Sequence, residues 1–333
     1  MEATMMQTTT MRAAVIHRFG GPEVVQVEQV PRPVPKADEL LVRVHASTVS
    51  IADHRTRSRD LPKGMWFYIP IALGVFRPRK RVLGMDAAGV VEAVGDEVAG
   101  FASGDEVIAM LGASFGAHAE YARVPQSDAI ALKPRNLTLE ESASLVFGGY
   151  TALAYLNRVK LGPGSEVLVN GASGAVGTSV VQLAKQRGAT VTGVCSASKA
   201  DLVRSLGADH VIDRAREDFA TSGRTYDVIV ECGGDAPFTR VEHSLKPGGA
   251  LLLVITSLGG ILTASRHTRR SGKTVTFTPG PVSHEDLAGL VRLAEAGEIR
   301  PVIDRTYDLD DIVEAHRYVD SGRKRGNVVL RIG

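Results

Sequence analysis

The chain has 333 residues, of which 44% are hydrophobic and 23% charged, and this composition is that of an ordinary globular protein. Its length predicts two domains, and its net charge of +2 argues against a protein built mainly to bind nucleic acid or an anionic membrane. The apolar run at residues 250–255 is too short to cross a bilayer, residues 1–11 lack a signal peptide's long apolar run, and the two cysteines, Cys195 and Cys232, argue against a disulfide framework. We therefore expect a cytoplasmic protein.

The first third of the chain is rich in Val, Gly and Pro, and its short segments alternate between apolar and polar residues. Gly-Asp turns at residues 95–96 and 104–105 punctuate the last part of this region. Many short strands separated by turn residues favour a compact antiparallel barrel or sandwich. The segments that predict strands are residues 12–16, 24–27, 39–44 and 88–94.

From about residue 138 the hydrophobic period changes, and strands alternate with helices. Thr138 is a candidate N-cap for a helix over residues 139–145. Near-continuous apolar strands separated by helices predict a doubly wound parallel sheet covered on both faces. The predicted strands are 167–170, 190–194, 210–213, 227–230, 250–254, 274–277 and 327–330, and further helices are predicted at 178–187, 201–206, 284–296 and about 310–320.

A glycine-rich turn joins the first of these strands to its helix. Gly174 and Gly177 occupy the second and third glycine positions of a G-x-G-x-x-G motif, whereas Ala172 replaces the first. A glycine at 174 allows the backbone to approach a pyrophosphate, one at 177 allows the helix to pack closely on the strand, and the helix N-terminus offers free amides. We expect a dinucleotide to bind at the segment Gly171-Ala172-Ser173-Gly174-Ala175-Val176-Gly177.

The residues after the second strand of this series indicate which dinucleotide binds. An NAD site normally has Asp or Glu there for the ribose 2′-hydroxyl, but residues 194–199 contain no acid. Ser196 and Lys199 suit a 2′-phosphate instead, and Arg214 after the third strand adds a second cation. The sequence therefore favours NADP(H), although Lys199 and Arg214 are also residues that simply solvate loop tips.

Two motifs resemble those of a known family. Residues 84–95, GMDAAGVVEAVG, are similar to the signature of the medium-chain dehydrogenase/reductase superfamily, and residues 170–177 resemble the cofactor turn of its zinc-free quinone oxidoreductase branch. This resemblance implies a GroES-like, mainly β catalytic domain made of residues 1–133 and 301–333, around a Rossmann domain of residues 134–300. It also implies an active site in the cleft between the domains, and a homodimer or homotetramer.

The resemblance bears on the metal as well. Where the zinc-dependent relatives carry catalytic zinc ligands, this chain has Ser50 and Met85, whose hydroxyl and thioether bind zinc poorly. Two cysteines also cannot form the relatives' four-cysteine zinc loop, and the scattered histidines His45, His54 and His118 show no metal-binding spacing. We therefore expect no metal. Without a Lewis acid, a simple alcohol is not readily ionised. Hydride can still be delivered to a carbon that is already electrophilic, as in a quinone or an α,β-unsaturated carbonyl compound.

The same resemblance suggests catalytic and nicotinamide-side residues. Ser50 occupies a position where relatives often have Asn, and it is the leading candidate to donate a hydrogen bond to the substrate oxygen. Asp53 is interpreted as the cap of a short helix, and Tyr68 or His54 as the proton donor, with solvent as an equal alternative. Thr151 is a cofactor contact or a helix cap. The remaining implied cofactor contacts are Gly149, Ile255, Thr256, Thr278 and Asn327, the last where relatives often have Lys.

Several alternatives stay open on the sequence alone. The protein is an NADPH-dependent reductase of quinones or enones, a zinc-free alcohol or aldehyde reductase of secondary metabolism, or an NADPH-binding protein without physiological catalysis. The aromatic cluster at residues 66–68 and Ile69–Ile71 line an apolar pocket or form a packed loop. Basic clusters at residues 77–81 and 266–270 are interpreted as solvated loops, with docking of an acidic partner or RNA as the alternative.

Overall fold

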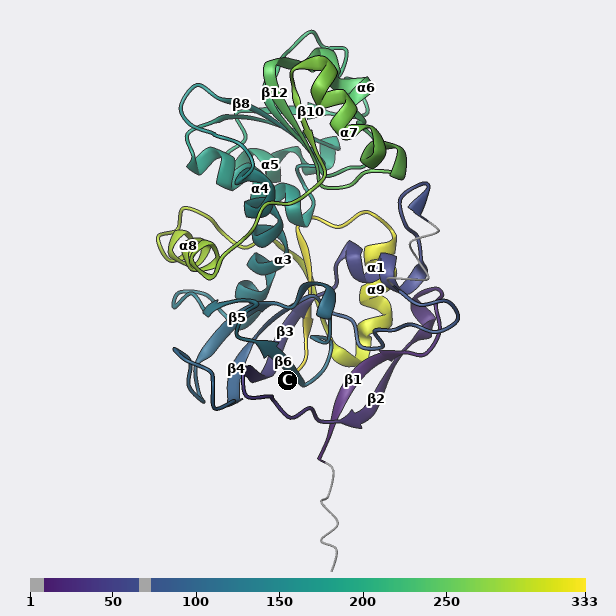
Figure 1. Ribbon diagram of the computed structural model, residues 1–333, viewed down its shortest axis with the longest axis vertical. Coiled ribbons are helices and arrows are strands. Elements are labelled where there is room, and N and C mark those ends of the chain that lie inside the picture. The colour runs from purple at the N-terminus through teal and green to yellow at the C-terminus, as the bar shows by residue number, and fades with distance from the viewer. Residues whose placement is uncertain (1–8, 66–72) are drawn as a thin grey trace, which may run out of the picture.

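The computed structural model describes residues 9–65 and 73–333, and it contains two large sheets joined by long helices (Figure 1). The strands of the catalytic part are β1 (Thr10–Ile16), β2 (Val25–Pro31), β3 (Glu39–Thr48), β4 (Asp86–Val94), β5 (Glu106–Met110), β6 (Tyr121–Pro125), β7 (Ala129–Leu132), β14 (Ile303–Asp308) and β15 (Asn327–Arg331). The remaining strands are β8 (Glu166–Asn170), β9 (Thr190–Cys195), β10 (His210–Asp213), β11 (Tyr226–Glu231), β12 (Leu245–Leu253) and β13 (Thr274–Thr276). The helices are α1 (Ile51–Ser58), α3 (Leu139–Leu156), α4 (Ala175–Gln186), α5 (Ala200–Ser205), α6 (Phe238–Val241), α7 (Leu258–Ser271), α8 (His284–Glu295) and α9 (Ile312–Asp320).

The six-stranded sheet has the order β10-β9-β8-β11-β12-β13, and every neighbouring pair is parallel. Its strands are apolar on both faces, as predicted. Val167 and Val169 pack into the hydrophobic cluster that contains α3 and α4, whereas Leu168 between them packs into the cluster that contains α6 and α7. This alternation confirms the doubly wound α/β half, and it places the strand-order reversal between β8 and β11.

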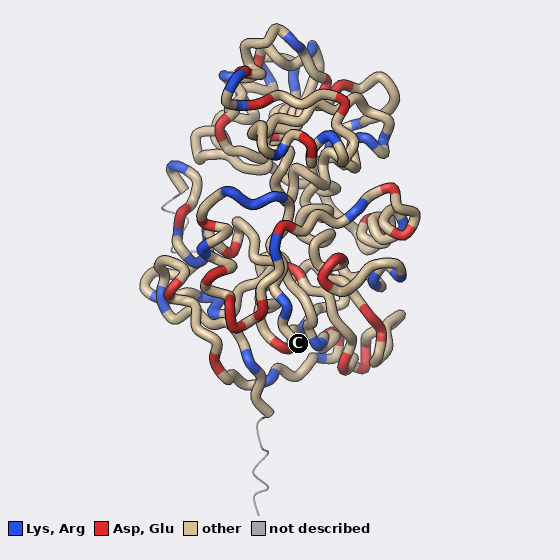
Figure 2. Tube along the Cα trace, turned by 180° about the vertical axis from the view of Figure 1, so that it is seen from behind, with Lys and Arg blue, Asp and Glu red and all other residues tan. Residues whose placement is uncertain are grey.

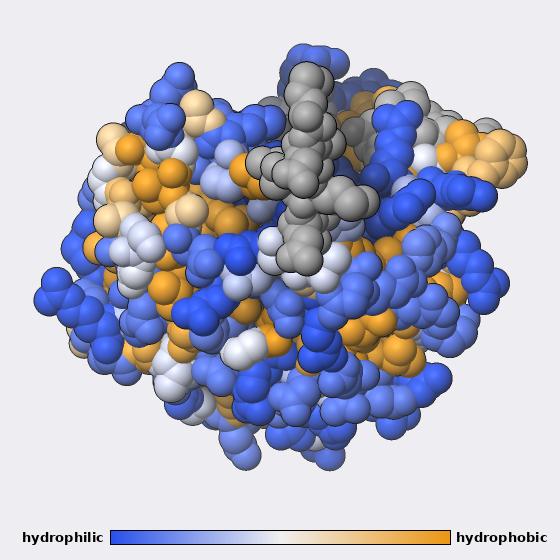
Figure 3. Space-filling model, turned by 90° about the horizontal axis from the view of Figure 1, so that it is seen from below, coloured by the Kyte–Doolittle hydropathy of each residue, from blue (hydrophilic) through white to orange (hydrophobic). Residues whose placement is uncertain are grey.

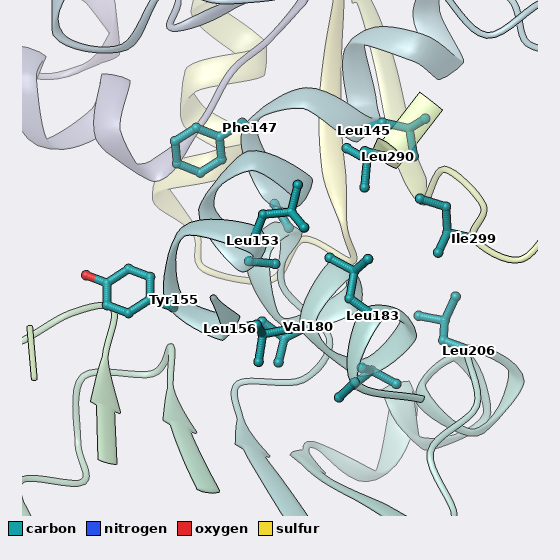
Figure 4. Close-up of a cluster of buried hydrophobic side chains, with 14 of the residues drawn as sticks. Leu145, Phe147, Leu153, Tyr155, Leu156, Val180, Leu183, Leu206, Leu290 and Ile299 are labelled. Carbon is teal, nitrogen blue, oxygen red and sulfur yellow. The ribbon is translucent and has the colours of Figure 1, made fainter. Parts of the chain in front are cut away.

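The first face of this sheet is covered by the largest apolar cluster of the described residues (Figure 4). Leu153 and Leu156 of α3 lie against Val180 and Leu183 of α4, and all four side chains are buried. Thr138 caps α3 as predicted, since its hydroxyl accepts the Glu141 amide while Glu141 bonds back to the Thr138 amide. These contacts hold α4, and therefore the glycine-rich turn before it, in a fixed position.

The seven-stranded sheet has the order β14-β15-β3-β4-β5-β7, with β6 paired to β3. Its pairs are antiparallel except for β14 with β15. The sheet thus joins strands from the first third of the chain to strands from its end, which confirms the GroES-like fold class inferred from the family resemblance. Because β15 lies beside β3, the C-terminal segment runs next to the start of α1.

The sequence-based interpretation was incomplete in several places, among them strands β5, β6 and β7, which were not named, and helix α3, which extends to Leu156. Residues 266–270 were interpreted as a solvated loop, but they lie in α7, with Arg266, Arg269 and Arg270 exposed. The basic residues 77–81 do lie outside the helices and strands and are exposed apart from Pro78. Strand β14 was not predicted, because its residues are mostly polar and half-buried or exposed, as at a sheet edge.

The surface of the catalytic part is mixed in character. On the face seen in Figure 3, hydrophobic residues form scattered patches in a mostly hydrophilic surface. Among the described residues, no helix is both long enough and apolar enough to span a membrane.

Candidate functional site

The glycine-rich turn lies at the carboxyl end of β8, where the strand order reverses. Helix α4 begins at Ala175 with Gly174 as its N-cap, and no side chain within residues 9–65 and 73–333 caps it. The long helices α3, α7 and α8, by contrast, each begin with a Ser or Thr hydroxyl that accepts a first-turn amide. The first amides of α4 therefore remain available as donors, as an anion at a helix N-terminus requires.

Two glycines of this turn, Gly171 and Gly177, are required by the local backbone and its packing. Gly171 has φ +80°, a conformation that favours glycine. A Cβ on Gly177 would lie 2.2 Å from the carbonyl oxygen of Gly171, and one on Gly193 of β9 would lie 3.1 Å from the Ala172 Cβ. The turn is therefore packed directly on β8 and β9. Gly193 was not singled out from the sequence, because its role depends on a neighbouring strand.

The C-terminal segment crosses this turn. The Gly326 amide donates to the Ser173 carbonyl oxygen at 2.8 Å, and Gly174 and Gly326 form a parallel bridge. Asn327 is buried, and its side-chain amide donates to the carbonyl oxygens of Ser144 and Val302. The side-chain amide of Asn327 therefore ties the segment to residues 144 and 302, and its contact with the cofactor phosphate stays a prediction.

A groove of about 760 Å³ opens beside the end of β9 and is lined from both parts of the protein. Ser196, Lys199 and Arg214, the residues predicted for the 2′-phosphate, all line it. Arg323 and Arg325 line the opposite side, and Figure 2 shows residues 323–325 as a blue stretch of chain between the two halves. Arg323 and Arg325 were missed from the sequence, although the run Arg323-Lys324-Arg325 was a visible signal.

The charges of this groove are poorly compensated. Among the described residues, the guanidinium groups of Arg214, Arg323 and Arg325 form no ion pair within 4 Å. The Lys199 ammonium donates to the Lys324 carbonyl oxygen at 2.8 Å, so it lies at the junction of the two linings. Burial, together with the positive charge of Arg214, lowers the pKa of Lys199.

Lys324 lies behind this lining and strengthens the positive potential. Burial of its ammonium, with a smaller contribution from Lys199, lowers the Lys324 pKa to about 8. Asp304 carries the negative charge nearest to this cluster, but its Oδ2 already accepts from the Tyr318 hydroxyl at 2.6 Å and from the Arg325 amide at 2.8 Å. A dianion bound in the groove would relieve the repulsion among these cations.

The end of β9 lacks the acid of an NAD site. Cys195 is the last residue of β9, and Ser196 and Ser198 follow it with their hydroxyl oxygens 3.5 Å apart. The nearest following carboxylate, Asp201, is 99% exposed and pairs with Arg204. The sequence analysis found no acid directly after this strand, and in the folded chain the first acid to follow it, Asp201, faces solvent.

Other predicted cofactor residues follow the ends of neighbouring strands. Ile255 and Thr256 follow β12 and Thr278 follows β13, on the same edge of the parallel sheet as the glycine-rich turn. Ile255 packs beside the loop after β11, since a Cβ on Gly234 would lie 3.2 Å from its side chain. That loop is held by the buried Glu231, which accepts from the amides of residues 233 and 234 and from Asn170.

Helix α3 gives different roles to two inferred contacts. A Cβ on Gly149 would lie 2.4 Å from Leu290 of α8, so Gly149 allows close helix packing. Its inferred cofactor contact stays a prediction. Thr151 lies inside α3 rather than at its cap, and its hydroxyl donates to the Phe147 carbonyl oxygen at 2.7 Å. Gly148 was missed, although a Cβ there would lie 2.4 Å from the carbonyl oxygen of Ala175 at the start of α4.

Ser50 is the N-cap of α1. Its hydroxyl accepts from the amides of Ala52 and Asp53, and it donates its single proton to Asp53 Oδ2 at 2.6 Å. The structure therefore gives Ser50 a capping role in place of the predicted substrate hydrogen bond. Asp53 is fully buried, and its other oxygen accepts the Gly84 amide, which confirms its interpretation as a capping residue.

His54 does not face open space either. Its Nδ1 lies 2.6 Å from Asp320 Oδ1, and its Nε2 lies 3.3 Å from Asp60 Oδ2. Both ring nitrogens therefore have carboxylate partners, and the role of His54 as a proton donor stays a prediction. Tyr68 and the neighbouring residues 66–71 of the predicted apolar cluster lie outside the described residues.

A buried carboxyl group holds the strand that leads into α1. Asp86 of β4 is 1% exposed and accepts from the Thr48 amide, the Thr48 hydroxyl and the Ser47 hydroxyl. Burial raises the Asp86 pKa to about 7 in spite of these hydrogen bonds, and Asp53 adds to the effect. Within residues 9–65 and 73–333, no three His, Cys, Asp or Glu side chains form a group that could hold a metal ion.

Together, the strand order, the uncapped helix at its reversal point and the cationic groove define a dinucleotide-binding protein with a GroES-like second part. Comparisons with known proteins place it more narrowly. Residues 36–134 match the alcohol dehydrogenase GroES-like domain family, and residues 206–330 match the zinc-binding dehydrogenase family. The chain belongs to the medium-chain dehydrogenase/reductase superfamily, as its motifs predicted.

Its relatives include reductases of two kinds. The chain is 32% identical to the chloroplastic quinone-oxidoreductase QR1 of Triphysaria versicolor, over 96% of this chain and 98% of that one. It is 31% identical to the 2-methylene-furan-3-one reductase of Solanum lycopersicum, over 96% and 79% of the two chains. The solved structure of the quinone oxidoreductase from Coxiella burnetii has a TM-score of 0.84 and 28% identity, over 98% of this chain and 100% of that one.

Proposed function

We propose that the protein is an NADPH-dependent, zinc-independent oxidoreductase that transfers hydride to a quinone or an α,β-unsaturated carbonyl compound. The observation that carries this proposal is the groove beside β9, where several uncompensated cations stand in the region at which an NAD site has a carboxylate. The names of the two plant relatives, a quinone-oxidoreductase and a 2-methylene-furan-3-one reductase, support the acceptor class.

The residues of the site fit NADPH. The first-turn amides of α4, at residues 175–177, would hold the pyrophosphate, because among the described residues no side chain caps this helix. The amides of Gly171, Ala172 and Gly174 already donate to backbone carbonyl oxygens and shape the turn. Ser196, Lys199 and Arg214 would hold the 2′-phosphate, joined by Arg323 and Arg325 from the other side of the groove. The residues Ile255, Thr256 and Thr278 at the strand ends, and Thr151 of α3, remain proposed cofactor contacts. The bound cofactor supplies the hydride.

The chain's own residues then act by positioning. Ser50 and Met85, at the positions of the relatives' zinc ligands, offer a hydroxyl that is already bonded to Asp53 and a thioether. An acceptor that is already electrophilic fits such a site, since the protein has only to align it and to stabilise the charge that develops. With Ser50 engaged elsewhere and both ring nitrogens of His54 beside carboxylates, we assign the final protonation to solvent, and Tyr68 and His54 remain candidate donors.

Three further assignments belong to the same proposal. The catalytic domain comprises residues 1–133 and 301–333, and the Rossmann domain comprises residues 134–300. The protein is a cytoplasmic homodimer or homotetramer that takes a small-molecule substrate. Strand β13 supports the assembly, because it is one of the two edge strands of the parallel sheet and another copy can pair with it. Light scattering after size-exclusion chromatography tests the oligomeric state.

Turnover assays test the proposed reaction. The protein, dialysed against a chelator, is mixed with NADPH and either 9,10-phenanthrenequinone or a panel of enones, and NADPH oxidation is followed at 340 nm. We expect turnover with at least one acceptor and no gain when zinc is restored. Tight NADPH binding without turnover of any acceptor would favour the noncatalytic alternative, and zinc-dependent recovery would contradict a zinc-independent mechanism.

A further inference from the structure

Helix α1 carries an arginine that the proposed site does not use. Arg57 is 0% exposed, and its guanidinium donates to the Gly20 carbonyl oxygen at 2.6 Å and to Asp320 Oδ2 at 2.6 Å. A buried ion pair adds little net stability, because desolvation offsets most of its attraction. Its best-attested role is to fix one arrangement of the elements that it joins. The question is therefore what the pair of Arg57 with Asp320 positions.

Asp320 is bound by two side chains of α1. Its Oδ2 accepts from Arg57, and its Oδ1 lies 2.6 Å from His54 Nδ1. His54 and Arg57 are three residues apart and therefore lie on the same face of the helix. Helix α1 is itself fixed, since Asp53 in its first turn accepts the Gly84 amide just before β4. The end of α9 is thus tied to the core of the catalytic part.

The cationic lining of the groove begins immediately after Asp320. Ser321, Gly322, Arg323 and Arg325 all line the groove, and Figure 1 shows this stretch crossing from α9 to β15. The far end of the stretch is anchored, because the Arg325 amide donates to Asp304 and the Gly326 amide donates to the Ser173 carbonyl oxygen. Asp320 is the corresponding anchor of the near end.

We propose that Asp320, held by Arg57 and His54, is a positioning residue that sets the preference for a 2′-phosphorylated cofactor. This inference rests on the proposed function. With both ends of residues 321–325 fixed, the Arg323 and Arg325 guanidinium groups are pre-organised and lose little conformational freedom when they meet the phosphate. Releasing the near end restores that freedom and weakens only those ligands that carry a 2′-phosphate.

The test uses Asp320→Asn and Asp320→Ala, with Asp311→Asn as a matched control on the exposed start of α9. The probes are 2′,5′-ADP and 5′-AMP, which differ only in the 2′-phosphate, and binding is measured by calorimetry. We expect Asp320→Ala to weaken 2′,5′-ADP about tenfold and 5′-AMP by less than about twofold. KM for NADPH should rise accordingly while kcat is retained, Asp320→Glu should recover part of the preference, and the control should match the wild type.

The remaining outcomes would contradict either the assignment of NADPH or the role of Asp320, and they can be told apart. If wild-type protein binds the two probes equally, the assignment of NADPH fails and the inference fails with it. If the wild type prefers 2′,5′-ADP and both Asp320 variants keep that preference, only the inference fails. If the variants weaken both probes equally, with a lower melting temperature and no recovery in Asp320→Glu, Asp320 is merely structural and the inference is wrong.

Discussion

The buried carboxyl group of Asp86 allows a quantitative prediction about stability and pH. Its folded-state pKa is about 7 against an ordinary 3.8, mainly because of burial. A raised folded-state pKa means that the folded protein holds the proton more tightly than the unfolded chain does. The associated stability is therefore fully present below pH 4 and is lost as the pH rises through 7. The complete effect is roughly 4 kcal/mol, of which about 2–3 kcal/mol falls between pH 5 and pH 8.

The substitution Asp86→Asn removes this titration while retaining an acceptor oxygen for Thr48. The unfolding free energy of the variant, relative to wild type, should increase by about 2–3 kcal/mol from pH 5 to pH 8. Urea denaturation followed by circular dichroism at several pH values measures the difference. Asp201→Asn is the control, since the Asp201 side chain is 99% exposed. If Asp86→Asn and wild type show parallel pH profiles, burial does not control the Asp86 proton and the reasoning is refuted.

Three other substitutions test the site and its surroundings. Gly177→Ala places a Cβ 2.2 Å from the Gly171 carbonyl oxygen, so we expect a loss of roughly 1–3 kcal/mol of stability and weaker NADPH binding, measured by denaturation and by fluorescence titration. Arg214→Gln should raise KM for NADPH about tenfold and leave KM for NADH within about twofold, and equal effects on both cofactors would remove Arg214 from the phosphate site. His316 is 0% exposed, neither of its ring nitrogens has a hydrogen-bond partner among the residues that the structure describes, and burial lowers its pKa. His316→Leu should therefore match the wild type's melting temperature or exceed it. A clear drop in that temperature would mean that the ring is hydrogen-bonded in solution.

The parallel half of the fold was predictable because its strands are apolar without interruption and its turns carry glycine. Strand β14 and helix α7 were not predicted. In β14, most residues are polar and either half-buried or exposed, so the sequence lacks the apolar residues that would predict a strand. In α7, only Ala264 is buried, and two glycines in the first turn weaken the helical pattern. Such elements depend on tertiary packing rather than on local sequence.

The residues of the candidate site also fall into two groups, those that the sequence predicted and those that it did not. Ser196, Lys199 and Arg214 follow the ends of the neighbouring strands β9 and β10, so the order of strands in the sequence was enough to bring them to one groove. The glycine-rich turn likewise follows the end of β8. The groove's second lining was not predictable, because it depends on residues 323–325 folding back across more than a hundred residues. The contacts of His54 with Asp320, which are 266 residues apart, were hidden for the same reason.

Equilibrium binding of NADPH and NADH to the wild-type protein tests the central claim most directly. The groove beside β9 predicts that NADPH binds at least about tenfold more tightly at moderate ionic strength, and that this preference shrinks as salt is added. Equal affinities, or tighter binding of NADH, would contradict the assignment of the groove to a 2′-phosphate.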